Sequence, residues 1–259
     1  MGLLDALRLP ETRGIASLDD PATTALHRAI ILGKPFLKRL YTDWYGIFRR
    51  SVAPPPEGRT LVELGSGGGF IKDVIPQATT SDVLDLPWVD QRFSALAMPF
   101  ADGTVDAFFM INVFHHLPDA AGFLAEVARC LKPGGRMVMI EPATTLWSRF
   151  IYRHFHHEAF DPGAGWTLEP GGPLSTANDA LPHIVFERDR ALFALRFPQL
   201  GIVRIAHHTQ LRYLVSGGVS MRQLVPSWSY GLVKMTETML APLGRLLGMF
   251  MTIEIERRA

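Results

Sequence analysis

Runs of apolar residues alternate along the middle of the chain with segments that carry apolar residues at helical spacing. The nearly continuous apolar runs at 60–64, 105–114 and 136–142 are typical of strands buried on both faces. Between the last two runs, residues 119–131 have the pattern of a helix that a Lys-Pro-Gly-Gly turn ends. Strands that alternate with helices predict a parallel sheet covered on both faces, and we therefore expect an α/β fold.

Two helices are predicted before this central region. Asp20 can cap the first helix and Pro21 suits its first turn, until residues 33–35 interrupt it and a second helix starts at Phe36. The second helix carries an aromatic stripe that either packs it on the core or covers a bound ligand. The stripe consists of Tyr41, Trp44, Tyr45 and Phe48.

The pattern changes after residue 142. Residues 145–160 predict a helix, and the Gly- and Pro-rich residues 161–179 predict a long loop of a kind that is usually functional or mobile. The remaining predicted elements are a helix at 186–197, a strand at 201–208, an amphipathic helix at 231–247 and a final strand at 250–258.

Composition narrows the class of protein. The 259 residues carry a net charge of +1 with both signs interspersed, so a nucleic-acid partner is not expected. The one cysteine, Cys130, excludes an intrachain disulfide and fits a reducing compartment. We find no secretory signal pattern and no apolar run of about 18 residues, so a cytoplasmic location is expected. The amphipathic segments 24–50 and 231–247 also permit peripheral contact with the inner face of the membrane.

A glycine-rich stretch, LVELGSGGGF at 61–70, follows the first buried strand. Glycines there let the backbone turn sharply and approach a ligand, and we expect a short helix at 70–75 whose first amides face that ligand. The dinucleotide pattern G-x-G-x-x-G/A fails, because Phe70 or Lys72 would occupy its last position. The pattern that fits is acid-x-G-x-G-x-G, formed by Glu63, Gly65, Gly67 and Gly69.

This pattern resembles motif I of the class I S-adenosylmethionine-dependent methyltransferases. The likeness extends in order over residues 60–142: MPFADGTVDAFFMINVFHHL and EVARCLKPGGRMVMIEP resemble motifs of the small-molecule, type 11-like branch. The resemblance implies a Rossmann-like three-layer sandwich with a mostly parallel seven-stranded sheet, its last strand antiparallel, plus N-terminal helices and insertions. It also implies S-adenosylmethionine as cofactor and S-adenosylhomocysteine as product.

The resemblance divides the chain into a helical cap or lid at 1–57 and a cofactor-binding domain at 58–259. Substrate-side insertions are expected at 143–200 and 208–246. Their many aromatic and aliphatic side chains favour an apolar or amphipathic small-molecule acceptor.

The same carry-over assigns the cofactor contacts. A carboxylate at the end of the second strand suits two ribose hydroxyls, which favours Asp82 and keeps Asp85 in reserve. Ser94 stands where the family often has an aspartate that contacts adenine, so this contact departs from the family pattern. The expected cofactor-binding residues are Glu63, Gly65, Ser66, Gly67, Gly69, Asp82, Ser94, Ala95, Ile111 and Asn112.

Two histidine pairs are the candidates for acid–base catalysis. His115 and His116 follow the fourth strand, at the sheet edge where parallel sheets bind ligands, and His156 and His157 form a second pair. A helix over 154–158 would place His154 and Glu158 on one face, a spacing that could ligate a metal. A polar wall is the favoured interpretation of that cluster, and no metal is predicted.

The expected function is methylation of a small molecule, with a hydroxyl oxygen favoured because histidines are available to take its proton. Three alternatives remain open: an N- or C-methyltransferase, a cofactor-binding scaffold without chemistry, and a nicotinamide oxidoreductase, against which the glycine spacing argues.

Overall fold

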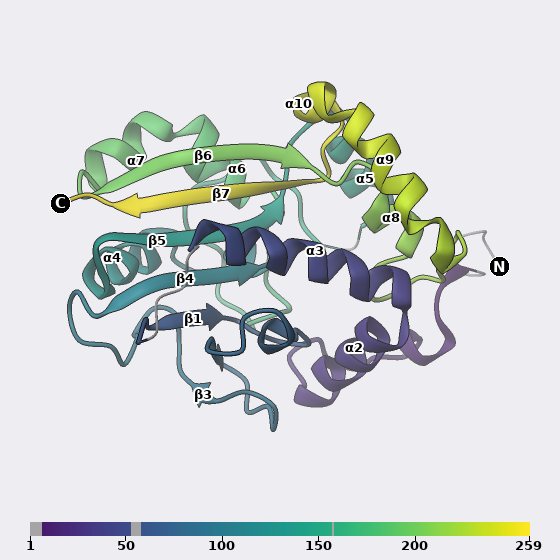
Figure 1. The fold of residues 1–259 in the computed structure, drawn as a ribbon, viewed down its shortest axis with the longest axis horizontal. Helices are drawn as coiled ribbons and strands as arrows, with labels where there is room; N and C mark the ends of the chain where they lie inside the picture. The colour runs from purple at the N-terminus through teal and green to yellow at the C-terminus, as the bar shows by residue number, and fades with distance from the viewer. Residues whose placement is uncertain (1–6, 53–57, 157) are drawn as a thin grey trace.

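The computed structural model describes residues 7–52, 58–156 and 158–259. Within these residues, seven strands form one sheet in the order β3-β2-β1-β4-β5-β7-β6 (Figure 1). The strands are β1 Leu61–Leu64, β2 Thr79–Asp82, β3 Gln91–Arg92, β4 Val105–Ile111, β5 Leu131–Pro142, β6 Leu200–His208 and β7 Phe250–Arg257. β7 runs antiparallel to both its neighbours, β5 and β6, while the pairs among β1 to β5 are parallel. The predicted α/β fold with an antiparallel last strand is confirmed.

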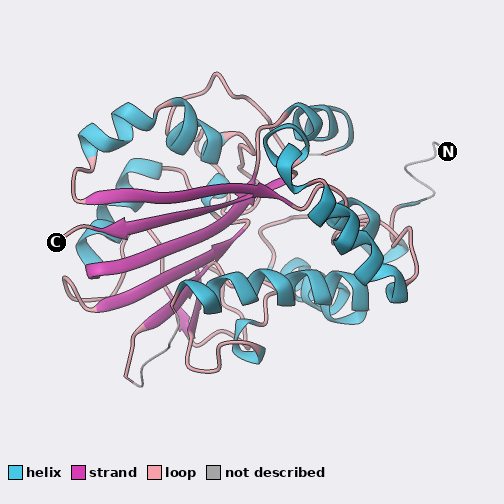
Figure 2. Cartoon of the chain, turned by 45° about the horizontal axis from the view of Figure 1, so that its top comes forward, coloured by secondary structure: helices cyan, strands magenta, loops and turns pink. Residues whose placement is uncertain are grey.

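Helices lie on both faces of this sheet (Figure 2). The α-helices are α2 Pro21–Gly33, α3 Pro35–Ser51, α4 Ala120–Cys130, α5 Leu146–Phe155, α6 Leu181–His183, α7 Arg190–Arg196, α8 Arg212–Ser216, α9 Tyr230–Met239 and α10 Gly244–Leu247. The Asp20 side chain caps α2 by accepting from the Ala22 backbone nitrogen, as the sequence predicts. None of the described helices combines the length and the apolar character needed to span a membrane.

The sheet separates two apolar cores. On one face, α4 and the segment 180–197 cover β4 and β5, with Phe123 and Phe186 fully buried. On the other face, α3 covers β1, β4 and β5, and its Phe48 ring stacks on Phe109 with ring centroids 4.9 Å apart. The aromatic stripe of α3 therefore serves mainly to pack this helix on the sheet.

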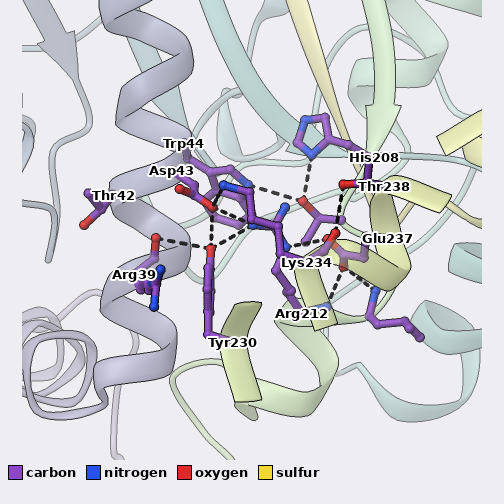
Figure 3. A network of polar contacts seen from close by, with 12 residues as sticks. Arg39, Thr42, Asp43, Trp44, His208, Arg212, Tyr230, Lys234, Glu237 and Thr238 are labelled. Carbon is purple, nitrogen blue, oxygen red and sulfur yellow. Dashed lines mark hydrogen bonds and ion pairs between the residues drawn. The ribbon is translucent and has the colours of Figure 1, made fainter. Parts of the chain in front are cut away.

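A buried polar network fixes α3 to the C-terminal insertion (Figure 3). The Arg212 guanidinium of α8 lies 2.7 Å from the Asp43 carboxylate of α3 and forms a second ion pair with Glu237 of α9. The Tyr230 hydroxyl donates to Asp43 at 2.6 Å and accepts from Arg212 at 2.7 Å. Because the groups pair with one another, α3 is held in one arrangement with α8 and α9, which lie more than 150 residues later in the chain.

Two predicted helices are interrupted. The segment 231–247 is not one helix: α9 ends at Met239, and Pro242 stands in the single 3₁₀ turn, Ala241–Leu243, that precedes α10. At 186–197, a π-helical turn, Ile184–Arg188, precedes the regular α7.

The helix predicted at 145–160 is shorter than expected. A capping box between Thr145 and Ser148 starts α5, but the helix ends at Phe155 and His156 has extended backbone. His154 and Glu158 therefore do not share a helix face, and the spacing argument for a metal on one helix is wrong. His156 instead turns inward and lies 3.1 Å from the Asp179 carboxylate, a tertiary contact that outweighs helix continuation.

Candidate active site

A cavity of about 1570 Å³ opens at the carboxyl ends of the parallel strands. The C-terminal residues of β4 and β5 and the loops after β1 and β2 reach it, as expected for a parallel sheet. A typical small-molecule pocket has about 300 to 1,000 Å³, so this cavity has room for two ligands together.

Every predicted site residue in the described part of the chain lines this one cavity. They are Glu63, Gly65, Ser66, Gly67, Gly69, Asp82, Ser94, Ala95, Ile111, Asn112, His115, His116 and His156. His157 lies outside the described residues. The reserve candidate Asp85 is exposed and does not line the cavity.

The glycine loop needs its glycines for two different reasons. Gly65 and Gly67 have φ of +62° and +47°, a left-handed conformation that side chains disfavour. A Cβ atom at Gly65 would also lie 2.6 Å from the Val113 side chain. The loop does not open a regular helix, since only the 3₁₀ turn Ile71–Asp73 follows before Pro76, so the helix expected at 70–75 is wrong.

Side chains from other segments form hydrogen bonds with the backbone amides and carbonyls of the loop. The Gly67 amide donates to Asp82 at 2.8 Å, and the Phe70 amide donates to the Tyr45 hydroxyl at 3.1 Å. The Gly67 carbonyl accepts from the Trp88 indole at 2.7 Å, and the Gly69 carbonyl accepts from Arg28. Four separate segments thus hold the loop in one shape before a ligand binds.

Gly68 has a role that the sequence motif does not include. A Cβ atom there would lie 2.9 Å from the backbone nitrogen of Arg28, so α2 contacts the loop directly. The Arg28 guanidinium also stands 5.2 Å from the centroid of the Trp88 ring. The motif pattern does not predict the need for glycine at position 68, because that need arises from a contact with a helix about 40 residues earlier in the chain.

Glu63 is the buried acid of the loop. Burial raises the pKa of its carboxyl to about 7, despite opposing hydrogen bonds from Ser66 and Tyr45. Its Oε2 and the Oδ1 of Asn112 are buried acceptors that have no hydrogen-bond partner among the described residues. Asn112 itself has φ of 55°, unusual for a residue other than glycine. Both residues line the cavity, but these two oxygens have almost no exposed surface and are buried within its wall.

Asp82 stands at the end of β2, as the sequence predicts. Its Oδ2 accepts from the Gly67 amide and its Oδ1 accepts from the Leu84 amide at 2.9 Å. Burial raises the pKa of the carboxyl, and the backbone hydrogen bonds oppose that shift. The carboxylate is thus oriented by the backbone on both sides.

A second polar group, of histidines and carboxylates, also lines the cavity. His115 is buried, with Nδ1 at 2.7 Å from Glu141 at the end of β5 and Nε2 at 3.4 Å from Glu158. Burial by itself would lower the pKa of His115, but the hydrogen bonds to Glu141 and Glu158 hold it well above its usual value. Glu141 and Glu158 lie far from the glycine loop in sequence, and the sequence analysis paired Glu158 with His154 rather than with His115.

His116 differs from its neighbour. Its Nδ1 lies 3.0 Å from the Thr176 carbonyl, which can only accept, so Nδ1 carries the hydrogen and Nε2 keeps a lone pair. Burial, with His115 beside it, lowers the pKa of His116 to about 4. The surroundings of the two adjacent histidines therefore shift their pKa values in opposite directions.

Comparisons with known proteins agree with this geometry. Residues 70–139 match the family model of a methyltransferase domain. An uncharacterized methyltransferase of Mycobacterium tuberculosis is 31% identical over 109 residues, covering 36% of this chain and 42% of the relative. A demethylmenaquinone methyltransferase of Lactiplantibacillus plantarum is 31% identical over 99 residues, covering 38% and 40%. The chain thus matches about two fifths of the length of each relative.

Fold comparison extends the likeness beyond the matched segment. The chain solved in complex with the Haloferax volcanii Trm112 methyltransferase activator has a TM-score of 0.51 and 16% identity, covering 93% of this chain and 99% of that one. The matched segment thus belongs to a methyltransferase domain, and over this segment the chain is similar to the class I S-adenosylmethionine-dependent methyltransferases. In this methyltransferase domain, the matched segment 70–139 starts directly after the glycine loop and ends within β5.

The residues of the methyltransferase domain fit the family's cofactor. S-adenosylmethionine carries a sulfonium and an ammonium group, and Glu63 and Asn112, whose side chains carry acceptor oxygens, are among the residues that line the cavity. Gly65 has a positive φ, and a Cβ atom there would collide with Val113. The backbone of residue 65 therefore forms this wall without a side chain. The site thus combines a close backbone approach with buried acceptors, as a cationic amino-acid tail requires.

Proposed function

We propose that this chain transfers a methyl group from S-adenosylmethionine to a hydroxyl oxygen of a small, amphipathic molecule. The observation that carries the proposal is one cavity with two chemically different ends. The glycine loop, Glu63 and Asp82 form one part of its lining, and a group of histidines and carboxylates forms another.

The cofactor end would be organised by residues already held in place. Asp82 would accept hydrogen bonds from the ribose hydroxyls, since a carboxylate offers two acceptor oxygens to two neighbouring donors. Glu63 and Asn112 would face the amino-acid tail, and Ser94 with Ala95 would border the adenine. The cofactor, when bound, supplies an electrophilic methyl group, and the chain's own residues position the acceptor and exclude water.

At the acceptor end, His116 is better suited than His115 to accept a proton. The Nε2 lone pair of His116 is available because its Nδ1 hydrogen points to Thr176. Both ring nitrogens of His115 already face carboxylates, so this histidine would orient groups rather than take a proton. A nearby proton acceptor favours an oxygen acceptor over a carbon or an amine that needs no base.

The cavity wall between the two ends is largely apolar, which supports an amphipathic acceptor. Contributing side chains come from the cap, from α5 and from the C-terminal insertion: Ile31, Ile151, Phe155, Tyr213, Leu214 and Leu224.

Peripheral membrane contact, if it occurs, would use α9 and α10 rather than α3. The aromatic stripe of α3 is buried, whereas Met235 and Met239 on α9 are 54% and 74% exposed. Leu246 on α10 is also exposed, and Lys234 and Arg245 lie on the same two helices. An exposed apolar face beside cations suits contact with an anionic lipid surface.

The deciding experiment is a paired measurement on the full chain. Calorimetry would measure S-adenosylmethionine binding, and transfer of a labelled methyl group to a panel of hydroxyl, amine and activated-carbon acceptors would measure turnover. We expect binding together with label in the hydroxyl acceptors. Label confined to amines or carbon would replace the oxygen proposal, and binding without turnover on any acceptor would favour the scaffold.

A further inference from the structure

The polar end of the cavity brings together four side chains from three separate segments. His115 comes from the 3₁₀ turn Phe114–His116, His156 and Glu158 from the stretch after α5, and Asp179 from the end of the long loop before α6. Backbone hydrogen bonds of 2.9 Å join Asn178 to His115 and Asp179 to Ala159. The segments are therefore fixed to each other by their main chains, and the side chains converge on a built framework.

The distances among these side chains resemble those between ligands of one ion. His115 Nε2 lies 3.4 Å from Glu158 and 3.8 Å from Asp179, and His156 Nδ1 lies 3.1 Å from Asp179 and 4.0 Å from Glu158. Tetrahedral ligands at about 2.0 to 2.2 Å from Zn²⁺ are roughly 3.3 to 3.6 Å apart. His156, Glu158 and Asp179 each offer a ligand atom within 4.8 Å of the other two, so one ion could reach these three groups with small side-chain rotations.

The surroundings are those of metal-binding histidines. A ligating histidine usually donates its other ring N–H to a carboxylate or a backbone carbonyl, which fixes its tautomer and orientation. Glu141 occupies this position for His115 at 2.7 Å, and the Thr176 carbonyl occupies it for His116 at 3.0 Å. Glu141 also accepts from the Val113 and Phe114 amides, so it is itself immobilised.

A second histidine–carboxylate group on the chain provides a comparison. Glu187 lies 2.9 Å from His183 and 3.3 Å from His207, so a single carboxylate is shared by two imidazoles. In the cavity, by contrast, Glu158 and the fully buried Asp179 converge on the same point. The cavity group therefore holds one more carboxylate than the group around Glu187 does, and it offers more oxygen ligands.

We propose that His156, Glu158 and Asp179 bind a divalent transition-metal ion such as Zn²⁺, with His115 and His116 at the edge of the site. Imidazole nitrogens with carboxylate oxygens are the donor set of zinc and related ions. The site borders the cavity, so a further coordination position would face the acceptor. Metal binding at this site does not depend on which atom is methylated, or on methyl transfer at all.

The test measures metal binding on the full chain without any assay of turnover. The protein is freed of metal with a chelator and titrated with Zn²⁺ alone against a chromophoric competitor, and with Co²⁺ alone by visible absorption. We expect one tightly bound ion per chain and the d–d bands of Co²⁺ held by nitrogen and oxygen ligands. Glu158→Gln and Asp179→Asn should each weaken binding roughly tenfold or more.

His154→Gln is the matched control, because His154 is an exposed histidine two residues before His156. We expect this variant to bind like the wild type. Absence of stoichiometric binding by the wild-type chain would overturn the proposal without reference to any variant. Equal binding by wild type and by folded Glu158→Gln and Asp179→Asn proteins, with circular dichroism as the folding check, would also overturn it.

Discussion

The Oδ2 atom of Asp82 lies 2.8 Å from the backbone nitrogen of Gly67, which joins the end of β2 to the middle of the glycine loop. The residue proposed to hold the ribose therefore also fixes the loop that is proposed to hold the amino-acid tail. Cofactor recognition and loop geometry are coupled through a single carboxylate.

Substitution of Asp82 by asparagine should weaken cofactor binding. Asparagine keeps the shape and one acceptor oxygen for Gly67, but loses the charge that favours two ribose donors, so we expect a loss of about 1 to 3 kcal/mol in binding free energy. Isothermal calorimetry with S-adenosylmethionine measures it. Asp85→Asn, on the exposed neighbour outside the cavity, should bind like the wild type. Equal affinities of Asp82→Asn and Asp85→Asn would remove Asp82 from the cofactor site.

A Gly68→Ala variant should disturb the contact between α2 and the loop. The new methyl group would meet the Arg28 backbone at 2.9 Å, and backbone cannot rotate away as a side chain can. We expect a loss of roughly 1 to 3 kcal/mol in the free energy of unfolding and weaker cofactor binding. Gly33→Ala, at the end of the same helix with open space around it, is the control and should not lose stability. A Gly68→Ala protein as stable as Gly33→Ala would contradict the close packing.

Glu63 should make the unliganded protein less stable as pH rises. Its folded-state pKa of about 7 is above the ordinary value of 4.5, so the folded state binds the proton more tightly than the unfolded chain does. The free energy of unfolding should therefore fall between about pH 4.5 and pH 7, by roughly 2 to 4 kcal/mol from this group. Urea titrations across this range, compared with Glu63→Gln, measure the effect. The glutamine variant should lack this part of the decline, and parallel curves for the two proteins would refute the assignment.

The Arg212 network should contribute more to stability than its neighbouring surface ion pair. Glu237→Gln leaves a buried guanidinium short of one negative partner, so we expect the free energy of unfolding to fall by about 2 to 4 kcal/mol. Lys234→Gln removes a half-exposed cation from Asp43 and should cost about 1 kcal/mol or less. Urea unfolding of both variants checks the difference. If Lys234→Gln lowers the free energy of unfolding more than Glu237→Gln does, the partly exposed Lys234–Asp43 pair is the more stabilising contact and the prediction is wrong.

The sheet could be predicted from the sequence because its signals are local. About a dozen residues are enough to recognise each of three elements: the apolar runs of β4 and β5, and the capped helix between them. The glycine motif likewise predicted the positions of Gly65, Gly67 and Asp82 along the cavity. These features depend on strand order and backbone conformation, which the motif encodes directly.

The polar cluster could not be predicted in the same way. Asp179 reaches His115 only because the 161–179 loop folds back over the cavity, and no periodicity encodes that path. The helix boundary at Phe155 was missed for a related reason, since helical spacing over 145–160 ignores the inward contact of His156 with Asp179. The contact between Gly68 and Arg28 was missed for the same reason, because it joins residues that are far apart in the sequence.

The antiparallel direction of β7 determines which terminus is suitable for attaching the protein to a surface. This strand carries the carboxyl terminus of the chain to the sheet end opposite the cavity (Figure 1), whereas Leu7, Arg8 and Thr12 near the amino terminus border the opening. Tethering the protein to a sensor surface through Ala259 would therefore leave the ligand entrance free for kinetic measurements. A fusion partner attached ahead of Leu7 would stand beside that entrance and could obstruct it.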